Sequence, residues 1–114
     1  MMNVTLHKII NELEKLGLKQ IYNGDDLVKF SYGDCNSTFI IIDKQKNCCT
    51  IFRQLRINTL GLYYMMAYTR YNLLSYMENP ITIDAIISEM KILISRYKEL
   101  KVYFKKYQIE QDFV

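Results

Sequence analysis

Residue types that carry common catalytic and metal-binding chemistry are scarce in this sequence of 114 residues. There is one histidine, His7, and there are three cysteines, none in the C-x-x-C spacing. Cys48 and Cys49 are adjacent, so in a strand they point to opposite faces and do not readily share a metal ion. A lone histidine with no cysteine nearby leaves no nucleophile–base pair. We therefore expect no catalytic residue, no metal, no cofactor and no disulfide framework.

Glycine is also sparse, and its four occurrences are isolated from one another. This arrangement excludes a glycine-rich loop that cradles phosphate. The paired carboxylates Asp25 and Asp26 follow Asn23-Gly24, the strongest short signal for a hairpin turn. We assign this acidic pair to a solvated turn rather than to acid–base catalysis. The protein is not expected to be an enzyme.

The N-terminal region lacks an uninterrupted apolar run, because Asn11, Glu12 and Glu14 interrupt it. A secretory signal is therefore not expected, and the cysteine usage is typical of a reducing compartment. These observations predict a cytoplasmic location. The net charge of +3 is mild.

The strongest pattern in the chain is an apolar stripe that predicts one long helix over Ile83 to Tyr107. Asn79-Pro80 disfavours helix before it, Thr82 is a candidate cap, and Asp84 suits the first turn. Beyond Tyr97 the stripe narrows to a seam. Its members recur at alternating spacings of three and four residues: Ile83, Ile86, Met90, Leu93, Tyr97, Leu100, Phe104 and Tyr107.

This helix is as long as a compact domain of the same chain length. At ~1.5 Å per residue it measures about 37 Å, whereas a compact chain of this size has a diameter of about 34 Å. The helix therefore runs along the whole core, or its end projects and pairs with another chain.

The first part of the chain predicts a helix followed by a meander. Helical spacing and a closing glycine favour a helix from Met2 to Leu16. Short apolar runs separated by turn residues then predict four antiparallel strands, with 54–59 as a connection. The predicted strands are 18–22, 27–32, 38–42 and 49–53.

Residues 60–77 are rich in tyrosine and methionine and have almost no polar side. We predict a second helix, wedged between the sheet and the long C-terminal helix or exposing one side as a contact surface. A membrane span is the less favoured alternative, because the run is barely long enough and contains Arg70 and Asn72.

The expected fold is a single α+β domain over 1–114: an N-terminal helix, a four-stranded antiparallel meander and two C-terminal helices packed on the sheet. Residues 109–114 are expected to form a frayed tail. The expected core consists of Leu6, Ile10, Leu13, Val28, Phe30, Ile40, Ile42, Ile51, Leu62, Met66, Leu73, Ile83, Ile86, Met90, Leu93 and Tyr97.

The order of elements resembles that of small uncharacterised proteins of phages and mobile elements in AT-rich Gram-positive bacteria. The resemblance includes the closing helix, introduced by Pro80-Ile81-Thr82-Ile83-Asp84 and continuing into Lys98-Glu99-Leu100. The apolar segment 60–77 departs from it. The resemblance implies no catalytic residues. It implies a binder of host proteins, such as an anti-CRISPR inhibitor, acting in the host cytoplasm.

Three functions follow as hypotheses. The first is a protein-binding module, with partner-binding residues Tyr64, Tyr68, Tyr71, Leu100, Phe104 and Tyr107. The second is a nucleic-acid binder, with a basic surface made of Arg53, Arg56, Lys98, Lys101, Lys105 and Lys106. The same basic residues are also typical of a solubilising face. The third is a homodimer, or another homo-oligomer, formed through the C-terminal helix.

Overall fold

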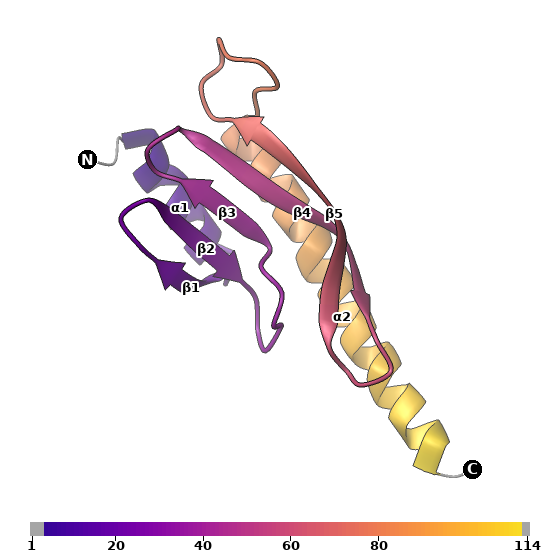
Figure 1. Cartoon of the computed structure of the whole chain (residues 1–114). Helices are drawn as coiled ribbons and strands as arrows, with labels where there is room; N and C mark the ends of the chain where they lie inside the picture. The colour runs from indigo at the N-terminus through magenta and orange to yellow at the C-terminus, as the bar shows by residue number, and fades with distance from the viewer. Residues whose placement is uncertain (1–3, 113–114) are drawn as a thin grey trace.

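A computed structural model describes residues 4–112 and has an α+β fold in two layers (Figure 1). Helix α1 (Val4–Lys15) precedes a five-stranded antiparallel sheet, and helix α2 (Ile83–Asp112) follows it. The strands pair in sequence order as a meander, and both helices lie behind the sheet in Figure 1. The strands are β1 (Lys19–Asn23), β2 (Leu27–Ser31), β3 (Ile40–Asp43), β4 (Cys48–Ile57) and β5 (Tyr63–Asn72).

The first helix, the first four strands and the long C-terminal helix were all predicted from the sequence. Thr82 caps α2 as expected, since its Oγ1 accepts a hydrogen bond from the backbone N–H of Ala85 at 3.1 Å. The helix has 30 residues. It continues through Ile109 to Asp112, part of the segment expected to fray, while residues 113–114 lie outside the described region.

The second C-terminal helix predicted over 60–77 is wrong. Residues 63–72 form β5, which pairs with β4 from Ile57↔Tyr63 to Cys48↔Asn72. The predicted connection 54–59 is also wrong in part, because β4 continues to Ile57. A turn containing Gly61, whose φ is +84°, joins the two strands. Pairing with β4 along its whole length made this segment a strand, and its tyrosines and threonine are compatible with strand structure.

The core lies between the sheet and the two helices. Most of the predicted core residues are buried there, and Leu73 and Ile83 pack against it while partly exposed. Leu62 and Met66 were assigned to the core wrongly, because they are 52% and 58% exposed. Leu62 belongs to the turn before β5. Met66 lies on the strand with its side chain away from the helices.

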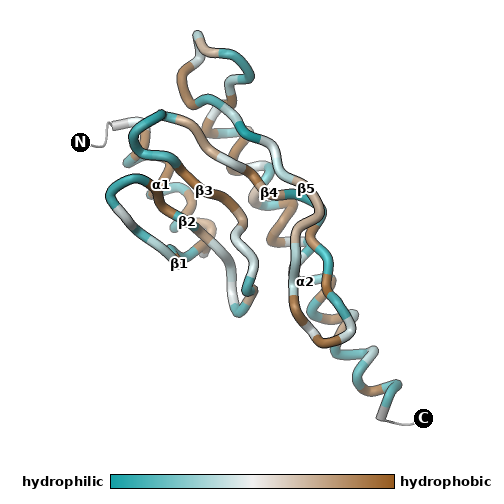
Figure 2. Tube along the Cα trace, in the orientation of Figure 1, coloured by the Kyte–Doolittle hydropathy of each residue, from teal (hydrophilic) through white to brown (hydrophobic). Residues whose placement is uncertain are grey.

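The molecule is elongated, with extents of 56 × 24 × 20 Å. The C-terminal part of α2 extends past the tip of the β4–β5 hairpin (Figure 1). Along α2, hydrophobic and hydrophilic residues alternate, whereas the strands at the centre of the sheet are mainly hydrophobic (Figure 2). No helix in residues 4–112 is long and apolar enough to cross a membrane.

Candidate protein-binding surface

The sheet has one face without a helix on it. Side chains of a strand alternate between the two faces, and in β5 the odd-numbered residues face the helices, beginning with buried Tyr63. The even-numbered residues of β5 therefore point to the open face, together with their partners on β4. We call six of these residues the open-face cluster: Phe52, Arg56, Tyr64, Met66, Tyr68 and Arg70.

The β5 members of this cluster form an exposed row. Tyr64 is 43% exposed, Met66 58% and Tyr68 70%. The ring of Phe52 on β4 lies beside that of Tyr68, with centroids 6.1 Å apart. A shallow hollow of about 460 Å³ opens along the row, with Ser37 and Thr38 at its border. The surface is therefore aromatic and apolar and already has a concave part.

Of the sequence-predicted residues, Tyr64, Tyr68 and Arg56 meet on this face. The prediction missed Phe52, Met66 and Arg70. The available signal was strand pairing: if 63–72 is placed opposite 48–57, Arg56 pairs with Tyr64 and Phe52 with Tyr68. Because residues 60–77 were predicted to form a helix, they were not paired with β4.

Tyr71 and Arg53 lie on the opposite, helix-covered face. The guanidinium of Arg53 donates hydrogen bonds to Glu89 on α2, to the hydroxyl of Tyr71, and to Thr69 Oγ1 at 3.2 Å. Burial by itself would lower the pKa of Arg53, but the hydrogen bond to Glu89 and the charge of Glu89 raise it overall. This group ties β4 and β5 to α2 and leaves neither Arg53 nor Tyr71 free for a partner.

The predicted seam of α2 is covered mainly by the chain itself. Leu100 is only 6% exposed. The rings of Phe104 and Tyr107 are half-buried and stack with centroids 6.0 Å apart. Phe104 packs so closely on the hairpin turn that a Cβ added at Gly61 would lie 2.9 Å from its ring. The hairpin turn thus covers the seam at Phe104, while a hollow of about 750 Å³ lined by Leu60, Tyr107 and Ile109 stays open beside it.

The predicted basic residues lie in two parts of the molecule, β4 and the C-terminal half of α2. Lys101 lies 3.5 Å from the carboxylate of Asp34, and Lys98 lies over the ring of Tyr32 at 5.9 Å. Lys105 and Lys106 are exposed near the far end of α2, whereas Arg56 lies on the open face. The four lysines thus follow one another along α2, with Lys98 and Lys106 lining one hollow, and the two arginines lie apart from them on β4.

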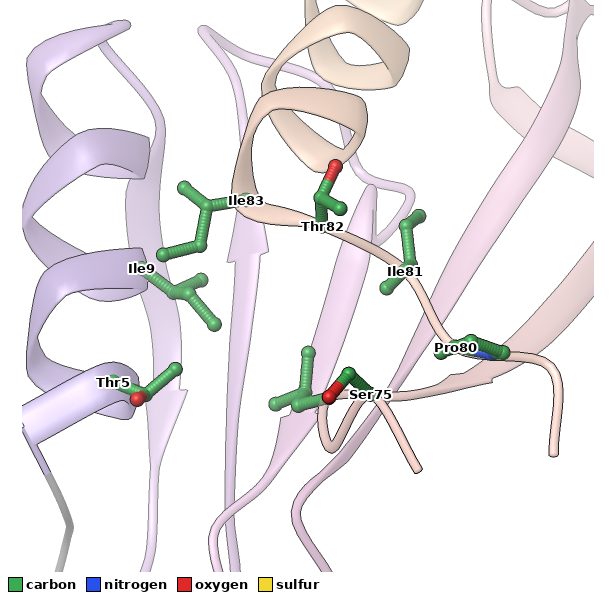
Figure 3. Close-up of a pocket in the computed structure, with 8 residues that line it drawn as sticks. Thr5, Ile9, Ser75, Pro80, Ile81, Thr82 and Ile83 are labelled. Carbon is green, nitrogen blue, oxygen red and sulfur yellow. The ribbon is translucent and has the colours of Figure 1, made fainter. Parts of the chain in front are cut away.

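Other features offer little reactive chemistry. No group of three His, Cys, Asp or Glu residues suited to a metal occurs among residues 4–112. Cys35, Cys48 and Cys49 are free and buried, and burial raises the pKa of Cys49 to about 12. A separate hollow of about 320 Å³ between α1 and the start of α2 is lined mainly by apolar side chains, including Ile9, Ile81 and Ile83 (Figure 3).

No protein-family model matches the chain, and neither the curated proteins nor the solved structures gave a match.

Proposed function

We propose that this protein is a non-enzymatic binding module that holds another protein against its open-face cluster. The observation that carries the proposal is the exposed row of Tyr64, Met66 and Tyr68, which has no helix over it. Tyrosine, methionine and arginine are enriched in protein interfaces, and the centre of an interface contains few charged residues. Tyrosine and arginine also supply many of the side chains that dominate binding energy.

The partner we favour is a host defence protein, for example a CRISPR effector. This part of the proposal is supported by the resemblance to small phage and mobile-element proteins. A nucleic-acid partner has less support, because Arg53 is bonded to Glu89 and Tyr71, and Lys101 is paired with Asp34. A homodimer through the α2 seam also has less support, since the hairpin tip packs on Phe104.

Site-specific photo-crosslinking tests the proposal. Tyr68 is replaced by a benzoyl-phenylalanine, and the variant is expressed in the native host. Tyr103 on α2 supplies a matched control, because it is the same residue type, is 61% exposed and lies away from the open face. We expect a discrete protein adduct from position 68 and none from position 103.

The captured protein is then purified and titrated against the unlabelled chain. We expect Tyr68→Ala to weaken its binding at least tenfold, about the effect of losing 1.4 kcal/mol, and Tyr103→Ala to leave it unchanged. Adducts from position 103 alone, or from neither position, contradict the proposal.

A further inference from the structure

Three cations surround the exposed aromatic row on the open face. Arg56 pairs with Tyr64 at one end of the row, and Arg70 follows Tyr68 at the other. Lys29 on β2 lies on the same face as Arg70, because paired residues of neighbouring strands share a face. The pairs that connect them across the sheet are Lys29↔Ile41, Ile41↔Thr50 and Thr50↔Arg70. The row of tyrosines and Met66 is therefore bounded by positive charge at both ends.

Among residues 4–112 no carboxylate forms an ion pair with these cations, although the hydrogen bond to Cys48 and, more weakly, the charge of Asp43 raise the pKa of Arg70. The four ion pairs among residues 4–112 are Lys15–Glu12, Arg53–Glu89, Arg96–Glu99 and Lys101–Asp34, and none involves a residue of the open face. Arg70 donates instead to the sulfur of Cys48 at 3.1 Å. Lys29 lies 5.7 Å from the ring centroid of Tyr22.

The strands β2–β5 place one carboxylate on this face, that of Asp43. Its Oδ1 accepts the backbone N–H groups of Gln45 at 3.0 Å and Lys46 at 2.9 Å. Asp43 therefore closes the β3–β4 turn. The border of the face therefore carries three cations and one carboxylate, with Asp43 near Arg70, and the centre of the face is apolar.

We infer, on the basis of the proposed function, that the open face binds an acidic segment of its protein partner. Carboxylates of that segment pair with Arg56 and Arg70 while its apolar side chains cover Tyr64, Met66 and Tyr68. Arginine is suited to this task, because its planar guanidinium binds carboxylate with two hydrogen bonds. Complementary charge around an apolar centre also selects the partner and speeds its association.

The strand geometry sets the size of the segment. Six residues separate Tyr64, the partner of Arg56, from Arg70, a distance of about 20 Å at ~3.3 Å per residue. The acidic positions of the partner should therefore lie about 20 Å apart, which six residues of extended chain or about 13 residues of helix span. Apolar residues belong between them, a requirement that distinguishes this ligand from a nucleic-acid backbone.

The test uses a fluorescent random copolymer of glutamate and tyrosine as the probe, measured by anisotropy with the full chain. Polyglutamate is the control that has the negative charge without the aromatic groups. Oligo(dT) is the control for binding of a single-stranded nucleic acid. We expect the glutamate–tyrosine copolymer to bind most tightly, and added salt to weaken its binding.

Two double variants with equal changes of charge locate the site. Arg56→Glu/Arg70→Glu should weaken binding of the copolymer at least tenfold. Lys105→Glu/Lys106→Glu, at exposed positions near the end of α2, should weaken it less than twofold. If the first variant does not retain a wild-type melting curve, Arg56→Gln/Arg70→Gln replaces it, and its binding should still fall several-fold.

Several outcomes overturn the inference: no binding of the copolymer, equal losses in the two charge variants, or tighter binding of oligo(dT). The last outcome assigns the face to single-stranded nucleic acid. Another outcome is a partner that is crosslinked at position 68 and still binds the Arg56/Arg70 double variants as tightly as the wild type. That outcome supports the proposed function and contradicts only the specificity for an acidic segment. Absence of any crosslinked partner is the failure of the proposed function itself.

Discussion

Tyr97 connects three parts of the molecule through one side chain. Its hydroxyl donates a hydrogen bond to the carboxylate of Asp34 in the β2–β3 loop and accepts the Asp34 backbone N–H at 3.3 Å. Its ring contacts Tyr32 edge-on and lies 5.2 Å from that of Tyr63. Gly33 permits this approach, since a Cβ there would lie 2.7 Å from the Tyr97 hydroxyl oxygen.

The Tyr97–Asp34 bond should make stability depend on pH in acid. The hydrogen bond from Tyr97, and after it the charge of Lys101, lowers the pKa of Asp34 below 3.8. The ionised carboxylate thus stabilises the fold above pH 3.8, and this contribution is lost as the pH falls through the lower folded-state value.

Tyr97→Phe should therefore reduce the free energy of unfolding by about 1 kcal/mol near pH 7, a small value because Asp34 is well exposed. The difference from the wild type should shrink as the pH is lowered below 3.8 and through the folded-state pKa of Asp34. Urea titrations at pH 7 and at a series of pH values below 3.8 measure it. In an Asp34→Asn background the effect of Tyr97→Phe should no longer vary with pH across this range, and a variation there would assign the effect to another group.

At the scale of elements, the hairpin turn and the end of α2 stabilise each other. The contact depends on Gly61, whose positive φ and lack of a side chain allow the Phe104 ring to approach the turn. This contact keeps a helix of 30 residues beside a hairpin that projects beyond the rest of the sheet. It also covers the seam at Phe104, whereas the hollow beside Tyr107 and Ile109 stays open.

Gly61→Ala should lower the free energy of unfolding by about 1–3 kcal/mol, from the cost of positive φ and the crowding of Phe104. In a Phe104→Ala background the cost should fall to about 1 kcal/mol, because only the backbone contribution remains. Denaturant titrations of the four proteins measure the coupling. Equal costs in the two backgrounds would mean that the ring does not crowd position 61.

At the scale of the whole molecule, the long hairpin and α2 make a single chain extended. The Cα radius of gyration is 15.8 Å, whereas a compact chain of this length has about 13 Å. The extension leaves one sheet face long and uncovered, which is the geometry that the proposed partner requires.

Small-angle scattering should therefore give a radius of gyration near 16 Å, slightly increased by bound water, together with the mass of one chain. The proposed partner is a different protein, so this mass should persist as the concentration is raised. Twice the mass and a larger radius would instead support pairing between copies, with Val102, Tyr103 and Ile109 as exposed apolar residues in the C-terminal half of α2.

The sequence by itself determined the two helices, the first three strands and the first half of β4. Met90 and Leu93 belong to the stripe whose spacing of three and four residues is that of an α-helix. Such a stripe arises whenever one side of a helix is buried, so it predicts the helix without knowledge of the partner surface. The turn at Asn23-Gly24 and the run Ile40–Ile42 likewise carry local signals for a turn and for buried strand residues. In these segments local preference and burial favour the same structure.

Only the tertiary structure decided residues 54–72 and, with them, the candidate site. Tyr63 and Met65 face the helices while Tyr64 and Met66 face solvent, so apolar residues occupy both sides of β5 and no alternation was visible. Pairing with β4 fixed the register and hence which tyrosines are exposed. The physical reason is that a strand obtains its hydrogen bonds from a neighbour distant in sequence, whereas a helix satisfies its own.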